Sequence, residues 1–489
     1  MTNRRKNQHL LWRAGFGPIA ENSAQLDDTD TRELWKLLVS TSEKMPDKIE
    51  VAENLIDGFF KGVSDVVAIK KIEREQKAAI SQKAIEMRKR SGADLKSLNN
   101  IWLGKMINSK AQLREKMSLF WHGHFACRVI NGYFQQELLH DIRSYSLGSF
   151  RDLLRAVSKS PAMVQYLNNL QNRKQHPNEN FAREVMELFT LGRGNYTEED
   201  VKEAARAFTG WSIDIRSEFA IKPSLHDDGV KTFMGKTGRF DGDDILDIIL
   251  EQKQTAKFIT SKVYRFFVNE KIDDGHVQWL AERFYQGGYN ILSLMNDIFL
   301  SDWFYNKENV GTRVKGPVEY LAGIRRFLPM ELENENIQLL YQKILGQVLF
   351  YPPNVAGWAG GKNWIDSSTL MVRLQIPRIL AVNDDISLTA KSDDDVEMGK
   401  GDEAMKGKMK SAAFISRAGS ADINWEPVIR IFESTLREGL HEKIVSCLLQ
   451  TESRIDGNLL ASYSDRTGRE AFIKSQVIQL MSTPEYQLA

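Results

Sequence analysis

Apolar residues recur at spacings of three and four positions along most of the chain, whereas strict alternation of apolar and polar residues is rare. Such a period is typical of amphipathic helices that bury one face. Leu34, Leu37 and Leu38 begin the series. The pattern predicts helices at residues 95–120, 150–157, 162–170, 181–191, 198–209, 255–268, 277–285, 291–299, 317–327, 337–346 and 367–380.

One segment of different character lies among the predicted helices. Residues 226–244, "HDDGVKTFMGKTGRFDGDD", have closely spaced Gly and Asp residues around Thr232 and Phe233. This composition is typical of a small β-hairpin or a structured loop. We therefore predict a mainly α protein, a multi-helical globular body with a small β-hairpin-like insertion at 223–244.

Two charged segments suggest how the chain is divided. Residues 69–90 contain eight Lys or Arg and three Glu, which fits a solvated helix or helical arm; an acidic or nucleic-acid partner is the alternative. Residues 383–411 carry many charges and no aromatic residue, so we expect a flexible insertion there. The prediction is a helical domain at 1–382, this insertion, and a C-terminal helical part at 412–489 that packs on the main body.

Composition is that of a folded globular protein, with 42% hydrophobic and 10% aromatic residues. The 66 basic and 65 acidic side chains leave a formal charge of +1, so we expect no nucleic-acid partner and no attraction to an anionic membrane. Cys127 and Cys447 form no CxxC pair, which argues against a disulfide scaffold or a thiolate zinc site. We see no membrane span and no apolar leader, and we therefore expect a cytoplasmic protein.

The stretch 176–211, "HPNENFAREVMELFTLGRGNYTEEDVKEAARAFTGW", contains clear signals for a helical hairpin. Pro177 and Asn178 predict a helix start, and Gly192 and Gly194 predict its end. Thr197, with an acidic residue three positions later, predicts the start of a second helix.

Polar residues lie beside the apolar face of the first of these helices. On a helical wheel Asn180, Glu184 and Glu187 flank that face, and Arg183 is next to them. Arginines such as Arg183 and Arg206 could neutralise these acids and fix the packing of the helix. Alternatively, two carboxylates one turn apart could face a cavity, where they hold a metal or transfer protons.

Further candidate chemistry lies in three other segments. His122 and His124 would point to different sides of an unbroken helix, but could converge on one ion if the helix ended at Gly123; a buried hydrogen-bonded histidine is the alternative. His226 and Asp227 could form an Asx-type turn or contact an anion. The loop 349–365, "LFYPPNVAGWAGGKNWI", lacks the pattern of a phosphate loop, and no GxSxG or Rossmann motif occurs.

Seven stretches together resemble an uncharacterised bacterial family, domain of unknown function 1800. They are "HLLWRAGFGP", "LREKMSLFWHGHF", "SPAMVQYLNN", "PNENFAREVMELFTLGRGNYTEEDVKEAARAFTGW", "HDDGVKTFMG", "RVKGPVEY" and "LFYPPNVAGWAGGKNWI". The resemblance implies no established reaction. It implies a genetic neighbour that is similar to alkaline phosphatases or sulfatases, and many relatives that are exported.

The family motifs fall on a set of mainly polar positions that core packing does not explain, which favours a shared polar cleft. These positions are His122, His124, Asn178, Glu179, Asn180, Arg183, Glu184, Glu187, Arg206, Trp211, His226, Asp227, Lys231, Asn354 and Trp358.

Two functions follow from these observations. The first is an enzyme, either with or without a bound metal, whose catalytic residues are Arg183, Glu184, Glu187 and His226. Its substrate contacts would be Asn180, Arg206, Asp227, Lys231, Asn354 and Trp358. A divalent iron, manganese or zinc ion would bind to His122, His124, Glu184 and Glu187, because mixed imidazole and carboxylate ligands suit these metals. The second is a non-catalytic binding or assembly protein that works with the phosphatase- or sulfatase-like protein.

Overall fold

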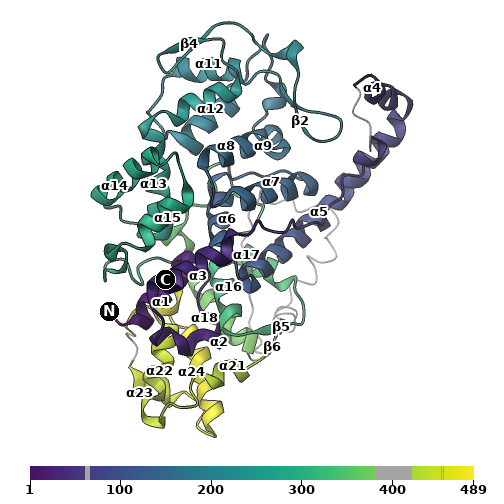
Figure 1. The fold of residues 1–489 in the computed structure, drawn as a ribbon. Coiled ribbons are helices and arrows are strands. Elements are labelled where there is room, and N and C mark those ends of the chain that lie inside the picture. Colours follow the sequence, from purple (N-terminus) through teal and green to yellow (C-terminus); the bar gives the residue numbers. More distant parts are fainter. Residues whose placement is uncertain (61–65, 382–420, 453, 455) are drawn as a thin grey trace.

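The fold is built almost entirely of helices, as the apolar periodicity predicts (Figure 1). A computed structural model describes residues 1–60, 66–381, 421–452, 454 and 456–489. The predicted insertion at 383–411 lies outside the described residues. None of the described helices combines the length and the apolar character that crossing a bilayer requires.

The first hydrophobic core includes Leu10, Trp121, Phe125 and Phe150, all fully buried. The helices around it are α1 (Asn3–Ala14), α3 (Thr31–Glu43), α6 (Gln112–His124), α7 (Gly132–Tyr145), α8 (Phe150–Lys159), α9 (Pro161–Tyr166), α10 (Asn180–Glu184), α11 (Glu198–Ala207), α12 (Gly242–Leu250), α13 (Lys253–Phe267), α14 (Asp274–Gln286) and α15 (Ile291–Phe299).

A second core lies at the other end of the molecule and joins helices from both sides of residues 382–420. Tyr320 and Ile376 share it with Val428, Ile444 and Val477, and each of these residues is fully buried. The helices around it are α16 (Pro317–Phe327), α17 (Ile337–Leu345), α18 (Ser367–Ala381), α21 (Glu426–Arg430), α22 (Leu440–Leu448), α23 (Gly457–Ser462) and α24 (Arg469–Met481).

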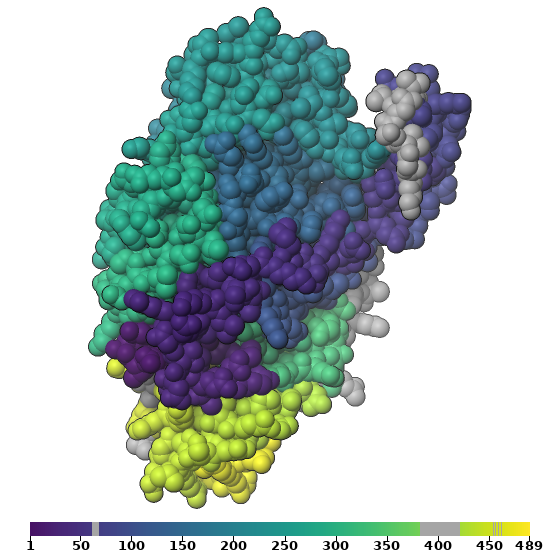
Figure 2. Space-filling model, viewed as in Figure 1, coloured from purple at the N-terminus to yellow at the C-terminus, as the bar shows by residue number. Residues whose placement is uncertain are grey.

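Helices α4 (Val66–Glu75) and α5 (Lys77–Asn108) form an arm, and its outer half projects from the body (Figures 1 and 2). Leu98 and Trp102 anchor the inner half of α5 in a third hydrophobic cluster. The helix predicted at 95–120 is in fact two helices. The chain turns after Asn108, where the Ser109 hydroxyl accepts a hydrogen bond from the backbone N–H of Ala111, and α6 begins at Gln112.

Three pairs of short antiparallel strands complete the described fold. The predicted hairpin is confirmed as β3 (Lys231–Phe233) paired with β4 (Lys236–Gly238). The sequence pattern did not indicate the other two pairs, β1 (Trp211–Ile213) with β2 (Phe219–Ile221), and β5 (Met330–Leu332) with β6 (Ala421–Ile423). Strands of three residues are too short for an alternating pattern to be recognised.

A buried ion network connects the first core to the second. Glu319, in the first turn of α16, accepts hydrogen bonds from Lys116 of α6, from Arg313 and from the backbone N–H of Gly316. All three charged side chains are at most 6% exposed. Burial raises the pKa of Glu319, but the charges of Arg313 and Lys116 outweigh it and hold that pKa well below the usual range.

Further buried cations reinforce the same junction. Arg13 of α1 donates to the carbonyl oxygens of Val268, Asn309 and Ala489 at 2.7 to 2.9 Å. Lys315 lies between the rings of Trp12 and Tyr486, at 3.6 and 3.9 Å from the ring centroids. These contacts hold α1 and residues 486–489 against the start of α16.

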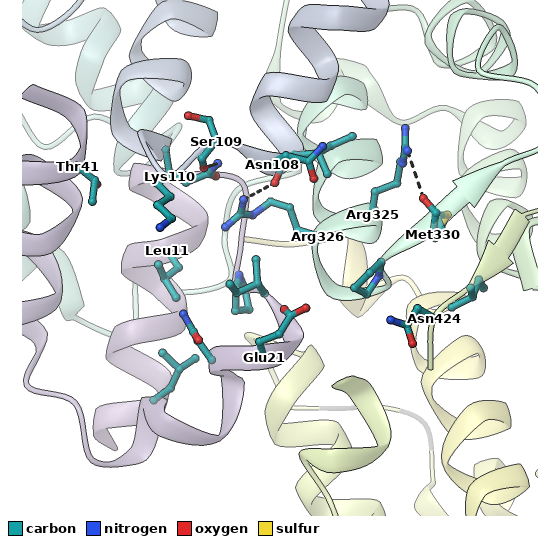
Figure 3. Close-up of a pocket in the computed structure, with 18 of the residues that line it drawn as sticks. Leu11, Glu21, Thr41, Asn108, Ser109, Lys110, Arg325, Arg326, Met330 and Asn424 are labelled. Atoms are coloured by element: carbon teal, nitrogen blue, oxygen red, sulfur yellow. Dashed lines mark hydrogen bonds between the residues drawn. The ribbon is translucent and has the colours of Figure 1, made fainter. Parts of the chain in front are cut away.

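A groove opens beside this junction (Figure 3). It is lined by residues of α1, α2 (Ala20–Ser23) and α3, of the α5–α6 turn, of α16 and of the β5–β6 pair, and by Lys474 of α24. We call it the junction groove.

The network predicts a large loss of stability when its one carboxylate is removed. Glu319→Gln leaves Lys116 and Arg313 buried without a counter-charge, which costs about 3–5 kcal/mol in the free energy of unfolding. The matched control is Glu335→Gln, because the Glu335 carboxylate is 53% exposed and lies 3.4 Å from Arg325; an exposed pair contributes about 0–1 kcal/mol. Urea unfolding measures both variants, and similar losses in the two would contradict this role for Glu319.

Candidate functional site

The predicted helical hairpin is present, and its first helix changes type at the polar stripe. Helix α10 ends at Glu184 and continues as a π-helix, η4 (Val185–Thr190). Gly192 and Gly194 then adopt positive φ angles of 80° and 82°, and α11 begins at a capping box between Thr197 and Asp200. π-Helical turns are rare, and those that do occur are often found at functional sites.

His124 and Lys262 bind the carbonyl groups at the end of the π-helix. The Nε2–H of His124 donates to Phe189 O at 3.1 Å, and Lys262 Nζ donates to Leu188 O at 2.9 Å. Lys262 Nζ also lies 3.4 Å from His124 Nδ1. Burial lowers the pKa of Lys262 to about 8, and burial together with the Lys262 charge lowers that of His124. His124 therefore fixes the hairpin as a neutral, hydrogen-bonded group.

His122 lies in a separate environment. Helix α6 runs unbroken through Gly123 to His124, so the two histidines point to different sides. The Nε2 of His122 accepts a hydrogen bond from the backbone N–H of Phe350 at 3.1 Å, and its ring lies 5.7 Å from that of Trp358. Burial lowers its pKa to about 3.

The loop at 349–365 packs on the end of α6, and among the described residues no hydrogen bond or ion pair joins it to the acids of the hairpin. Gly357, at φ 79°, brings its backbone so close to α6 that an added Cβ would lie 2.4 Å from Gly123 O. Asn354 is exposed, and its side chain accepts a hydrogen bond from the N–H of Ala356. Asn354 and Trp358 therefore have structural contacts in this loop.

The acids of the hairpin are paired locally, with one exception. Arg183 binds Glu179 and Glu198 at 3.0 and 2.7 Å. Glu187 accepts from Tyr196 at 2.8 Å and from Arg193 at 2.7 Å, and the Tyr196 hydrogen bond is the main cause of its lowered pKa.

The exception is Glu184, which forms no hydrogen bond or ion pair within the described part of the chain. Its side chain is half-buried, and both burial and the charge of Glu187 raise its pKa. Beside it, Asn180 donates to Leu167 O at 3.0 Å. The hollow around residues 176–180 and Arg183 is open to solvent.

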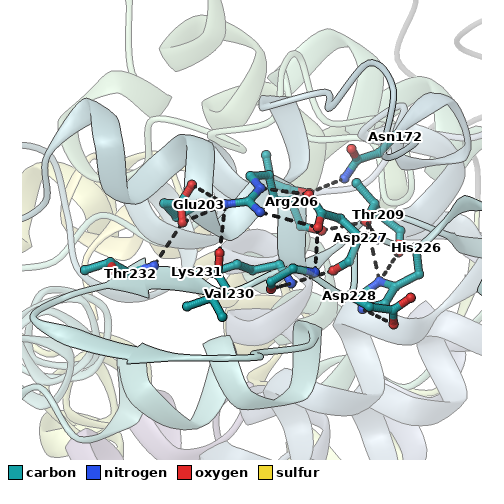
Figure 4. A network of polar contacts seen from close by, with 12 residues as sticks. Asn172, Glu203, Arg206, Thr209, His226, Asp227, Asp228, Val230, Lys231 and Thr232 are labelled. Atoms are coloured by element: carbon teal, nitrogen blue, oxygen red, sulfur yellow. Dashed lines mark hydrogen bonds and ion pairs between the residues drawn. The ribbon is translucent and has the colours of Figure 1, made fainter.

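Arg206 organises a second polar network at the base of the β3–β4 hairpin (Figure 4). Its guanidinium group binds Glu203 and Asp227, both at 2.8 Å. The Nδ1–H of His226 donates to Thr209 O at 2.8 Å, and Lys231, which is 1% exposed, donates to the backbone oxygen of Asp227. The Asp227 carboxylate also accepts from Gly229 N at 2.8 Å, so the Asx-type turn is the arrangement observed.

The predicted metal ligands are not assembled. Across residues 1–60, 66–381 and 421–489, apart from 453 and 455, no group of three or more His, Cys, Asp or Glu residues is placed to hold a metal ion. The structure therefore does not bring His122, His124, Glu184 and Glu187 together as one ligand set among these residues. His122 binds the backbone through Nε2, and both ring nitrogens of His124 have neighbours, Phe189 O and Lys262 Nζ. Glu187 is paired with Arg193.

The junction groove, which the sequence did not reveal, has a cavity volume of about 1340 Å³. One wall is apolar and contains Leu11, Ile19, Leu34 and Leu38. Leu37 also lines the groove and is 57% exposed, although the sequence pattern grouped it with the core. No sequence signal could have located the groove, because its lining comes from segments far apart in the chain.

Charged and amide side chains also line the groove (Figure 3). Arg325 and Arg326 project from the end of α16, and Arg326 donates to Ile107 O at 2.6 Å. Lys110 and Asn108 lie at the α5–α6 turn. The cations of the groove are Lys110, Arg325, Arg326 and Lys474, and its acids are Glu21, Glu331 and Asp422.

Comparison with known proteins yields one finding. The chain matches the family described as "Protein of unknown function (DUF1800)" over residues 9–488. No curated protein and no solved structure matches it.

Because three histidines are buried, we expect the stability of the folded protein to fall at acid pH. His9, His122 and His124 have pKa values lowered by burial, so below about pH 6.5 each takes up a proton in the unfolded state only. Each then lowers the free energy of unfolding by up to about 1.4 kcal/mol per pH unit as the pH falls.

The test is urea unfolding of His122→Gln between about pH 7 and pH 5, the range in which an unfolded histidine takes up its proton. Glutamine can still accept from Phe350, so we expect a shallower dependence of stability on pH than in the wild type. Exposed His176 supplies the control variant His176→Gln, which should keep the wild-type slope. An unchanged slope in His122→Gln would contradict the assignment.

Glu184 should titrate above the usual range of a glutamate, because it is half-buried beside Glu187. Carboxyl-selective NMR of the full chain measures this pKa directly. Glu187→Gln removes the neighbouring negative charge and should therefore lower the pKa of Glu184. Glu199→Gln, on the exposed face of α11, should leave the pKa of Glu184 unchanged. A wild-type pKa at or below about 4.3, the usual value, would contradict the burial argument.

Proposed function

Because the chain belongs to the DUF1800 family of proteins of unknown function, we propose its function from its own geometry: it is a binding protein whose junction groove takes an extended segment of a partner protein. The observation that supports this proposal is the groove itself. It combines an exposed leucine and an apolar wall with a charged rim, and it lies where the two largest cores meet.

The size of the groove favours a peptide over a small molecule. Small-molecule sites usually have volumes of about 300–1,000 Å³ and enclose their ligand, whereas the junction groove has about 1340 Å³ and is open along one side. A wide groove of this kind suits a segment of several residues whose apolar side chains cover Leu37 and Leu38.

The backbone of the groove favours an extended conformation of that segment. Strands β5 and β6 pair only with each other among the described residues, so the outer edge of each can accept a further strand. Glu331 and Asp422 lie directly opposite each other in the β5–β6 register. Like charges in such a pair are destabilising, so a basic side chain of the bound segment would stabilise this end of the groove.

The family resemblance implies which partner to test first. A phosphatase- or sulfatase-like protein is expected to work with members of the family, and we propose that a segment of that protein occupies the groove. The predicted enzyme remains a second candidate, favoured only by Glu184, whose unpaired, half-buried carboxyl has the raised pKa that a proton-transfer group requires.

The groove proposal predicts a position-specific loss of binding. Peptides selected on the full chain from a displayed random library should lose at least about tenfold in affinity for Leu37→Asp, because an apolar anchor contributes about 1–3 kcal/mol. Leu37 is exposed, so the substitution should leave folding intact. Fluorescence polarisation of the labelled peptides measures the affinity.

The matched control is Leu300→Asp, since Leu300 is 44% exposed and does not line the groove. It should bind the selected peptides as the wild type does. Failure to select any peptide, or equal affinities for Leu37→Asp and the wild type, would refute a peptide-binding groove.

A further inference from the structure

Arg326 is a buried cation in the wall of the junction groove. Its side chain is 8% exposed, and no carboxylate of the described residues forms an ion pair with it. Its neighbour on α16, Arg325, is by contrast paired with Glu335 at 3.4 Å. A buried charge without a counter-charge is costly, so an anion bound at Arg326 would stabilise this wall of the groove.

Two backbone carbonyl groups hold the Arg326 guanidinium in place. Its Nε donates to Gly17 O at 2.9 Å, and its Nη1 donates to Ile107 O at 2.6 Å. Its Nη2 has no hydrogen-bond partner within the described part of the chain and is not sealed in the interior. A planar guanidinium group that is fixed in this way presents its remaining N–H donors in a defined direction, which suits a carboxylate.

Further donors lie beside Arg326 at the α5–α6 turn. Figure 3 shows that Arg326 reaches toward this turn, whereas Arg325 reaches toward Met330. Asn108 and Lys110 of the turn line the groove and are exposed. Neither side chain forms a hydrogen bond or ion pair with another described residue, so both can bind a ligand.

The acid of the groove that acts on Arg326 is Glu21. Burial lowers the pKa of Arg326 to about 10, and the charge of Glu21 partly opposes this shift, so Arg326 stays charged at neutral pH. Glu21 is exposed and forms no hydrogen bond or ion pair within the described residues. Its charge therefore competes with that of a bound anion without occupying the anion's place.

We propose that Arg326 binds a carboxylate of the segment that occupies the junction groove, with Lys110 as the second cation. The carboxylate belongs either to an acidic side chain or to a free C-terminus. This inference rests on the proposed function, because it specifies what the bound segment carries.

Peptides selected on the full chain from a displayed random library test the inference in three synthetic forms. The first is the selected sequence, the second has its acidic side chains changed to amides, and the third has an amidated C-terminus. One of the two neutralised forms should bind about tenfold more weakly, the expected effect of losing a charge-assisted hydrogen bond. The form that loses affinity identifies the source of the carboxylate.

Variants of the protein locate the binding site of that carboxylate. Lys110→Met should weaken the selected peptide several-fold and leave the neutralised form unchanged. Glu21→Gln removes the competing charge and should strengthen binding of the selected peptide only. The matched control is Glu33→Gln, because Glu33 is exposed, pairs with Lys36 and does not line the groove; it should change neither affinity.

Arg326→Gln separates binding from a purely structural role. If Arg326 binds the carboxylate, the variant should bind the selected and the neutralised peptide with similar affinity, whereas a structural role would weaken both forms equally and overturn the inference. Peptides that depend on Leu37 but bind equally in all three forms would overturn the carboxylate site and leave the groove proposal intact. Failure to select any peptide would overturn both.

Discussion

The need to pair every buried charge constrains this structure more than any other factor. An unpaired charge in the interior costs several kcal/mol, and this chain buries Lys116, Arg313 and Glu319 where its two largest cores meet. The ion pairs between these side chains fix α6 against the start of α16. The junction groove follows from the same arrangement, because the N-terminal helices are held beside the end of α16 and the β5–β6 pair.

The same constraint explains why most of the charged motif residues are paired with nearby groups. Charged residues of the hairpin find partners nearby in the chain: Arg183 pairs with Glu198, 15 residues away, and Arg206 pairs with Asp227, 21 residues away. His124 binds a backbone carbonyl of the π-helix. These residues build the hairpin and attach it to the body. The need to pair buried polar groups therefore accounts for part of this polar motif, in addition to any catalytic or binding role.

Local signals in the sequence predicted local structure well. The capping box at Thr197 and Asp200, the positive φ of Gly192 and the hairpin after His226 are all present, because each depends on neighbours within a few positions. The π-helix at 185–190 was not predicted, since it depends on Lys262 and His124, which come from distant segments. The junction groove was missed for the same reason: it is lined by segments far apart in the sequence.

We propose that a partner binds to the junction groove and not to the polar hairpin. Hydrogen–deuterium exchange of the full chain with and without a selected peptide tests it most directly. We expect slower exchange at residues 34–41, at 108–112 and in β5 and β6. Slower exchange confined to residues 176–187, with the groove unchanged, would contradict binding in the groove and would place the functional site around Glu184.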